Sequence, residues 1–179
     1  MAKKHPYPPV RDYGDIERES FDSYYGRWPQ ELSNIPKPVV EDWIHRHWNC
    51  FEERWSALAP HKWEYHLETF SNDRILAIDH VLTWIQDLDA EGVEYVTDKP
   101  RAQTRLARFM LEHGTFPVPI IVAQDASHLI APGSGGEHMK APLHLIEGHS
   151  RLACIRGMIN SSYPTLKPQH SVWVVKIPK

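Results

Sequence analysis

The sequence is poor in cysteine and in long apolar runs. Only Cys50 and Cys154 are cysteines among its 179 residues, so a framework of several disulfides is excluded and a cytoplasmic setting is expected. The apolar runs are a few residues long, whereas a membrane-spanning helix needs roughly 20. The N-terminal residues are basic and proline-rich with no apolar stretch behind them, so we expect no secretory signal peptide.

The chain also lacks a strong excess of charge of one sign. It has 20 Lys and Arg against 23 Asp and Glu, a net charge of −3, which does not by itself indicate a nucleic-acid partner. The charge is unevenly distributed, because residues 41–100 carry 5 basic and 13 acidic side chains and residues 101–179 carry 9 basic and 4 acidic ones. The C-terminal part could hold an anion, or the two parts could be solvated faces of opposite sign.

The sequence pattern divides the chain into three parts. Residues 1–38 contain several prolines and no helical period, which predicts an extended proline-rich arm. Residues 39–100 predict a tryptophan-rich helical extension, and we expect most of its tryptophans to lie in the core. Its apolar spacing predicts a first helix that Pro60 ends, a second helical stretch with Trp63, Leu67 and Phe70 on one face, and a third helix from Asn72 that Gly92 closes.

Residues 101–179 alternate between helix and strand patterns. The expected order is a helix over 101–113 with Gly114 as its cap, a strand over 117–123, a loop over 125–141, a strand over 143–147, a helix over 150–160 and a strand over 171–177. This order predicts an α+β fold in which helices pack on a small mixed sheet. The arm and the helical extension are added to that core.

The segment LHLIEGHSRLACIRGM, residues 143–158, is the most informative one for function. A strand, a glycine turn at Gly148 and a helix start near Ser150 would point several backbone N–H groups toward an anion. Ser150 could cap the helix and bind phosphate oxygens, and Arg151 could bind phosphate with its guanidinium. The alternative is that Gly148 only makes a tight turn, Ser150 only caps, and Arg151 pairs with Glu147 or lies in solvent.

Three elements together, HGTFPVPIIV, LHLIEGHSRLACIRGM and SVWVVKI, resemble the ParB/sulfiredoxin superfamily over about residues 101–177. The resemblance implies a ParB/sulfiredoxin-like core that binds nucleotide or nucleic-acid phosphate, with a nucleotide such as ATP or CTP and Mg²⁺ as cofactors. Such domains often belong to bacterial mobile elements or defence loci. The phosphate-binding residues it implies are Gly148, His149, Ser150 and Arg151.

The chain departs from two branches of that superfamily. Sulfiredoxins have a catalytic cysteine directly after the glycine, where this chain has His149. Chromosome-partition ParB proteins have a glutamate and further arginines, where this chain has His149, Ser150 and Ala153. We therefore expect a stand-alone member of the superfamily, without sulfiredoxin activity and without the CTP clamp of partition proteins.

Two functions remain open. The first is phosphate binding, with a Mg-dependent nuclease, NTPase or kinase as the enzyme classes it allows. The second is a non-catalytic interaction or regulatory module with a residual phosphate site, which would bind a protein partner through the tryptophan-rich half. For the first, the candidates are Glu147 as base or magnesium ligand, His149 as general acid or base, Asp125 as a further carboxylate, and Arg101, Arg105 and Arg108 for nucleic-acid backbone contacts.

Twelve histidines raise the question of a metal site. His45 and His47 are two residues apart, and His61 and His66 are five apart, whereas a zinc site on one helix face needs a spacing of four. His138, His144 and His149 flank the glycine-rich loop and could converge, but their spacing does not require it. We expect no metal site.

Overall fold

The computed structural model describes residues 5–97 and 100–179 as a mixed α+β fold, which confirms the expected fold class. It packs as two compact units, one up to Tyr65 and one from His66 to Ile177. The boundary lies inside residues 39–100, which the sequence pattern treats as one segment. In the described residues, no helix is both long and apolar enough for a membrane crossing.

The first unit consists of short helical segments. They are α1 (Phe21–Tyr25), η1 (Gln30–Leu32), α2 (Lys37–Val39), η2 (Val40–His45), α3 (Trp48–Cys50), η3 (Phe51–Trp55), η4 (Ser56–Leu58) and η5 (Pro60–Lys62). The predicted helix from residue 39 to Pro60 is present, but it is interrupted at His47, whose backbone leaves the helical region with φ −121° and ψ 40°.

Four tryptophans lie in the core of this unit, as expected: Trp43, Trp48, Trp55 and Trp63. The ring of Trp43 meets those of Phe51, Trp55 and Trp63 at centroid distances of 5.1, 5.6 and 6.1 Å. The proline-rich arm adds Tyr7 to the buried side chains, and its hydroxyl lies 2.9 Å from His61 Nδ1. The arm therefore packs on its own unit.

The second unit is built on a mixed sheet with the strand order β1-β5-β3-β4-β2. Strand β3 pairs parallel with β5 and antiparallel with β4, and β2 pairs parallel with β4. The elements are β1 (Glu64–Ser71), α4 (Asn72–Leu76), β2 (Ile78–Asp79), α5 (Trp84–Tyr95), η6 (Pro100–Gln103), α6 (Arg105–His113), β3 (Ile120–Gln124), β4 (Leu143–Glu147), α7 (His149–Asn160) and β5 (Gln169–Lys176).

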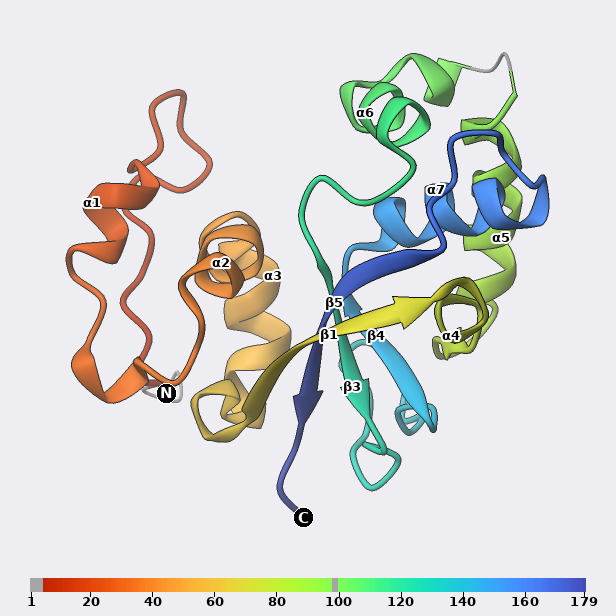
Figure 1. Ribbon diagram of the computed structural model, residues 1–179. Coiled ribbons are helices and arrows are strands. Elements are labelled where there is room, and N and C mark those ends of the chain that lie inside the picture. The colour runs from red at the N-terminus through yellow and green to blue at the C-terminus, as the bar shows by residue number, and fades with distance from the viewer. Residues whose placement is uncertain (1–4, 98–99) are drawn as a thin grey trace. The chain divides into compact units, whose positions relative to one another are not determined.

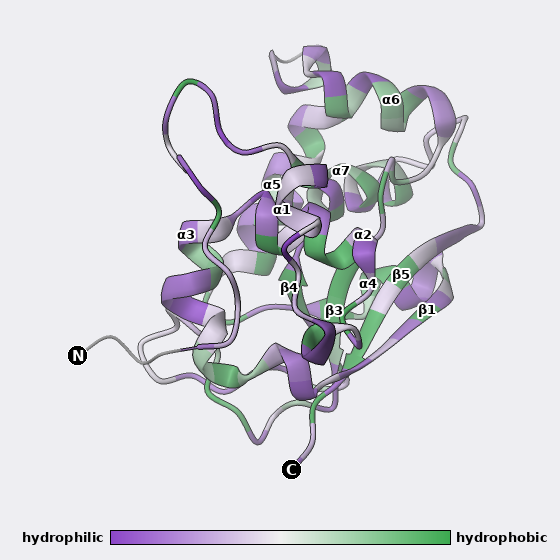
Figure 2. Ribbon diagram, turned by 90° about the vertical axis from the view of Figure 1, so that its left-hand side faces the viewer, coloured by the Kyte–Doolittle hydropathy of each residue, from purple (hydrophilic) through white to green (hydrophobic). Residues whose placement is uncertain are grey.

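The apolar residues of this unit explain its layers. Strands β3, β4 and β5 are largely hydrophobic in Figure 2, and α5 and α7 lie side by side in Figure 1. Side chains from the central strands and from α7, such as Val122, Leu145 and Ile155, form one buried cluster. The predicted helix of residues 101–113 is largely present as α6, and Gly114 ends it with φ 72°.

Two predictions from the helical period are wrong. The stretch with Trp63, Leu67 and Phe70 is the strand β1, in which Phe70 is buried and Leu67 exposed, because pairing within a sheet overrides a short apolar spacing. The third predicted helix is two helices, α4 and α5, separated by β2. Gly92 does not close it but lies inside α5, where a Cβ would come within 2.6 Å of the Ala153 carbonyl oxygen of α7.

Candidate functional site

The segment from β4 to α7 has the predicted order of a strand, a glycine turn and a helix start. Gly148 is the N-cap of α7 with φ 106°, and a Cβ there would lie 2.5 Å from Ile120 Cγ2, so both the backbone angle and the space require glycine. The helix begins at His149 and has no side-chain cap. The prediction that Ser150 caps it is therefore wrong, because Ser150 is already the second helical residue.

The Arg151 side chain is directed into the protein, toward the residues that precede β3, and not toward solvent at the turn. This side chain is buried, and its Nη1 donates to the carbonyl oxygens of Val118 and Pro119 at 3.0 and 3.1 Å. Its Nη2 pairs with the Glu147 carboxylate. The structure thus places Arg151 and Glu147 together, as in the alternative role considered for this pair, and the guanidinium ties α7 to the residues that lead into β3.

A cluster of aromatic rings lies at the start of α7. Nε2 of His149 is 3.3 Å from Nε2 of His80, and the rings of His80 and His144 are 4.8 Å apart. The indole of Trp84 stacks on His80 at 4.9 Å with an interplanar angle of 17°, and its centroid is 5.2 Å from that of His149. Three imidazoles and one indole therefore gather beside the first turn of the helix.

The hydrogen bonds of this cluster indicate which ring nitrogens of the histidines carry a proton. His80 Nδ1 donates to the Val81 carbonyl at 3.4 Å, so its Nε2 accepts from His149. His144 Nδ1 accepts from the Lys140 backbone N–H at 3.3 Å. Burial, reinforced by the neighbouring imidazoles and Lys140, lowers the pKa of His144 to about 3. Burial is also the main cause that lowers the pKa of His80, so both rings are neutral near pH 7.

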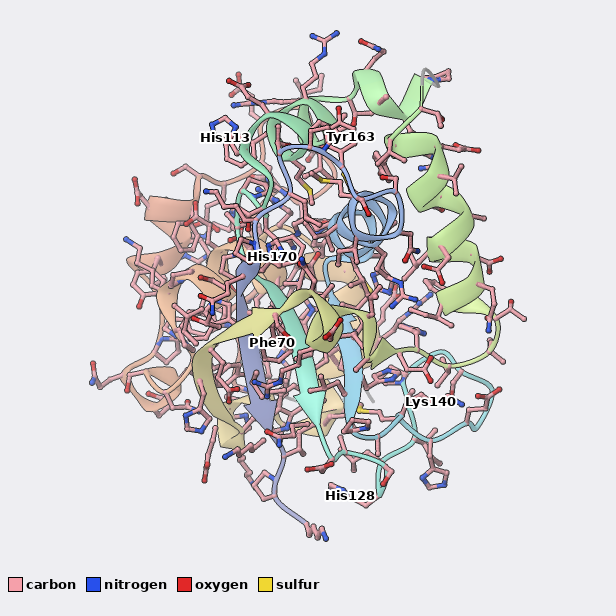
Figure 3. All side chains as sticks on the ribbon, turned by 45° about the vertical axis from the view of Figure 1, so that its right-hand side comes forward. Phe70, His113, His128, Lys140, Tyr163 and His170 are labelled. Atoms are coloured by element: carbon pink, nitrogen blue, oxygen red, sulfur yellow. The ribbon has the colours of Figure 1, made fainter. Side chains whose placement is uncertain are left out.

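The glycine-rich loop between β3 and β4 is attached to the same cluster. Glu137 accepts from the Leu82 backbone N–H and from Lys140 Nζ, both at 3.2 Å. Ser134 holds the loop by donating to the Glu137 carbonyl at 2.9 Å. Lys140, labelled in Figure 3, thus brings a positive charge close to the histidines.

His80 and Trp84 were not predicted from the sequence. The parallel pairing of β2 with β4 matches Asp79 with His144, and this register brings His80 to the cluster. No local spacing reveals that register, because the two strands are more than sixty residues apart in the chain. His138 does not join the cluster, since its side chain is exposed and its Nδ1 lies 2.9 Å from the Ser127 carbonyl oxygen.

Asp125 lies at the opposite end of β4 from the turn. Its backbone N–H donates to Pro142 at 3.0 Å, and the adjacent pair is Gln124 with Leu143, whereas Glu147 pairs with Ile121. Four residues of strand, about 13 Å, separate the two ends. The structure therefore brings Glu147 and His149 to the turn, but not Asp125.

The three arginines expected to contact a nucleic-acid backbone lie on η6 and α6. Arg101 is paired with Glu94 at 2.8 Å and with Glu91 at 3.4 Å, while Arg108 Nη2 donates to Gln103 Oε1 at 3.2 Å. Arg105 is exposed at the start of α6. At least one of the three charges is thus neutralised by acidic neighbours.

Residues 5–97 and 100–179 contain no group of three or more His, Cys, Asp or Glu side chains arranged to hold a metal ion. The fold and the site define an α+β protein with an uncapped helix start beside a histidine–tryptophan cluster. Comparisons with protein-family models, curated proteins and solved structures found no match.

Proposed function

We propose that the protein binds the phosphate of a nucleotide or of a single-stranded nucleic acid at the start of α7. The observation that carries this proposal is the position of Trp84 and His149 beside the uncapped first turn of a twelve-residue helix. The first backbone N–H groups of a helix have no partner within the helix. Together with the helix dipole, equivalent to about half a positive charge, they favour an anion.

Lys140 and the imidazoles complete the proposed phosphate site. His80 and His144 are neutral near pH 7 and bond to Val81, His149 and Lys140 within the cluster, so they shape the site, while Lys140, paired with Glu137, places a cation beside it. Phosphate binding would raise the pKa of the nearby imidazoles because it places negative charge beside them. Arg151 acts as a positioning residue, since its bonds to Val118, Pro119 and Glu147 fix the turn from behind.

Trp84 supports a ligand that has a base as well as a phosphate. Its side chain is 41% exposed, while Trp43, Trp48, Trp55 and Trp63 are buried. One face of the indole stacks on His80. Stacking of a base on an aromatic side chain contributes about 1–3 kcal/mol, so an unpaired base fits this position better than a duplex.

Binding is the central part of the proposal, and hydrolysis or phosphoryl transfer by His149 is a separate part that the turnover experiment below tests. His149 is the candidate acid or base that would touch the ligand. The Glu147 carboxylate pairs with Arg151 and Asp125 lies at the other end of β4, so these two carboxylates do not fit a shared Mg²⁺ site. The internal pairing of Arg151 favours the alternative, a regulatory module with a residual phosphate site. The burial of Trp43, Trp48, Trp55 and Trp63 argues against the tryptophan-rich half as its partner surface.

Thermal unfolding with ATP, CTP, GTP and a short single-stranded DNA, each with and without Mg²⁺, tests the proposal. A ligand that binds only the folded protein raises the Tm in a saturable manner. We expect this shift for the parent chain and for His138→Gln, whose side chain is exposed away from the cluster. His149→Gln should reduce it strongly. A flat response of the parent chain to every ligand would overturn the proposal.

The same samples decide between binding and catalysis. Each nucleotide and the DNA are incubated with the parent chain and with His149→Gln, and the products are separated by chromatography. Turnover that His149→Gln abolishes would make His149 a catalytic residue. Saturable binding without turnover would leave the protein as a binding module.

A further inference from the structure

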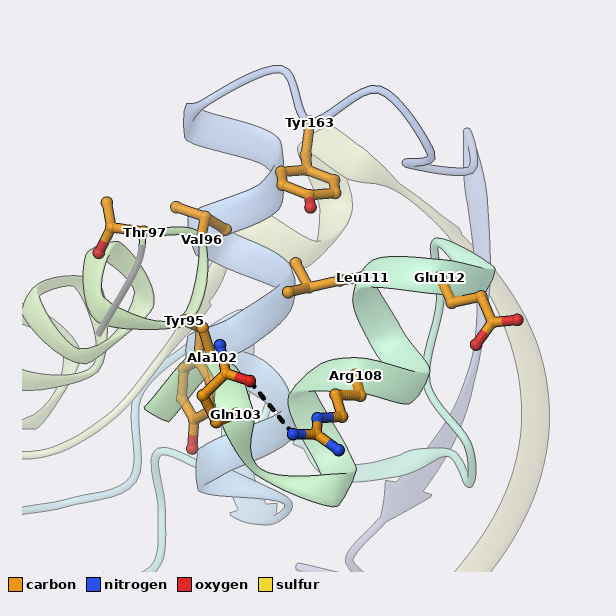
Figure 4. Close-up of a pocket in the computed structure, with 9 residues that line it drawn as sticks. All are labelled: Tyr95, Val96, Thr97, Ala102, Gln103, Arg108, Leu111, Glu112 and Tyr163. Atoms are coloured by element: carbon orange, nitrogen blue, oxygen red, sulfur yellow. Dashed lines mark hydrogen bonds between the residues drawn. The ribbon is translucent and has the colours of Figure 1, made fainter. Parts of the chain in front are cut away.

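The second unit has a pocket at the other end of α7. Its volume is about 450 Å³, within the range of small-molecule sites, roughly 300–1,000 Å³. It lies between the end of α5, η6, α6 and the turn after α7, as Figure 4 shows. Because a helix of twelve residues is about 18 Å long, this pocket is distinct from the cluster at His149. The lining residues used below are Val96, Ala102, Gln103, Arg108, Leu111 and Tyr163.

One end of the pocket is cationic. Arg108 donates from Nη2 to Gln103 Oε1 at 3.2 Å, and this bond is drawn in Figure 4. Among the described residues, no carboxylate lies within ion-pair distance of Arg108, whereas Arg101 has Glu91 and Glu94. The Glu112 carboxylate points away from Arg108 in the same view. The pocket thus presents a guanidinium whose charge the described chain does not neutralise.

The rest of the pocket has a mixed lining, in which Val96 and Leu111 form an apolar patch among polar side chains that include the Tyr163 hydroxyl. Leu111 and Val96 lie between Arg108 and Tyr163, and the Tyr163 hydroxyl is directed toward them in Figure 4. Ala102, a small residue, leaves room beside Gln103. A ligand that matches this order has an anionic group, an apolar body and a polar far end.

We propose that this pocket binds a small planar organic carboxylate. The carboxylate would accept two parallel hydrogen bonds from the fork of Arg108, the geometry for which guanidinium is best suited. The ring would lie on Val96 and Leu111, and a polar substituent would meet the Tyr163 hydroxyl. Inorganic phosphate fits less well, because it would meet a single cationic side chain among the described lining residues, Arg108, and has no apolar body to cover Val96 and Leu111.

Isothermal titration of the full chain with sodium 4-hydroxybenzoate tests the proposal. We expect saturable binding that weakens about tenfold or more in Arg108→Gln, since a bidentate charged contact is lost. Lys167→Gln also removes one exposed positive charge from this unit, outside the pocket, and should bind as the parent chain does. Ala102→Leu, which fills the pocket, should weaken binding with the arginine intact.

Two further probes identify the chemistry that is recognised. The neutral 4-hydroxybenzamide should bind at least tenfold more weakly than 4-hydroxybenzoate. Inorganic phosphate should not displace bound 4-hydroxybenzoate. Equal affinity for the amide, displacement by phosphate, or no saturable binding of 4-hydroxybenzoate would each overturn the proposal. Far-ultraviolet circular dichroism of every variant verifies that it is folded. The nucleotide site at His149 takes no part in these results, so either proposal can fail alone.

Discussion

Gly92 of α5 and Gly157 of α7 face each other where the two helices cross. A Cβ on Gly92 would lie 2.6 Å from the Ala153 carbonyl oxygen and 3.0 Å from the Gly157 backbone nitrogen. Only a residue without a side chain permits this approach. The contact brings the two helix backbones together and so helps to hold α5, which begins at Trp84, beside α7, which begins at His149.

We expect Gly92→Ala to lower the free energy of unfolding by about 3 kcal/mol, the upper part of the range for overpacked sites, because backbone atoms cannot move aside as a side chain can. Urea unfolding measures this loss. Gly26→Ala is the matched control, since its Cβ would meet only Asp22 O at 3.3 Å and Ser23 O at 3.4 Å. If Gly92→Ala is as stable as the parent chain, the helices do not cross as closely as described.

Arg151→Ala should destabilise the protein by about 3 kcal/mol. The substitution leaves the carbonyls of Val118 and Pro119 without this donor and removes the ion pair between Arg151 and the partly buried Glu147 carboxylate, and breaking a buried ion pair costs about 3–5 kcal/mol. Arg151→Lys should recover only part of the loss, because one ammonium cannot reach all three acceptors. Denaturant unfolding gives both values.

The double variant Arg151→Met with Glu147→Leu separates the pair from a ligand contact. It replaces both partners by apolar side chains, so it should be more stable than Arg151→Ala. Nucleotide binding should persist in the double variant if Arg151 only positions the turn. Complete loss of binding in a folded double variant would instead assign Arg151 a direct contact with the phosphate.

The C-terminal half of the fold was predictable because its signals are local. The run PVPIIVA, the turn at Gly148 and the cap at Gly114 each determine an element within a few residues. The segment around Phe70 was not predictable, because its apolar spacing matches a helix while pairing in the sheet makes it a strand. Local patterns do not contain that long-range partner.

The candidate site was predictable only in part. The sequence places Glu147, Gly148 and His149 next to each other, and the structure keeps them at one turn. His80 and Trp84 reach the turn through the pairing of β2 with β4. A strand of two residues is too short for its sequence pattern to predict that pairing. The direction of Arg151 was also open, because a guanidinium one turn into a helix can face either a ligand or the adjacent strand.

Acidification from pH 7 to about pH 4 should destabilise the fold through its buried histidines. Burial lowers the pKa of His144 to about 3 and is the main cause that lowers that of His170 to about 4. In the unfolded chain these rings take up protons near pH 6.5, so between that pH and the folded pKa the unfolded state binds more protons. Each histidine then removes up to about 1.4 kcal/mol of stability per pH unit.

Urea unfolding at several pH values measures this slope. His170→Gln should reduce the slope, because it removes a titrating ring, the one that bonds Thr115 at 2.9 Å and Asn72 at 2.8 Å. Figure 3 shows the position of His170 at the start of β5. His113→Gln changes an exposed ring on α6 and should keep the parent slope. A slope that is the same in all three proteins would mean that His170 is not the group that titrates.

Substitution of Trp43 should lower stability more than substitution of Trp84 does, whereas substitution of Trp84 should have the larger effect on ligand affinity. Trp43→Leu removes a ring that contacts Phe51, Trp55 and Trp63, so we expect a loss of about 3 kcal/mol of stability, near the lower end of the values for large aromatic truncations. Trp84→Leu should cost less than about 1 kcal/mol, because 41% of the side chain is already in solvent.

Ligand affinity should show the reverse order, since Trp84, at the start of α5, lies beside His149 at the start of α7 and stacks on His80. Loss of base stacking in Trp84→Leu should weaken nucleotide binding by about tenfold, while ribose 5-phosphate, which has no base, should bind the parent and the variant equally. The two titrations compare the same phosphate site with and without a base. Equal weakening for both ligands would show that Trp84 shapes the phosphate site instead of stacking on a base.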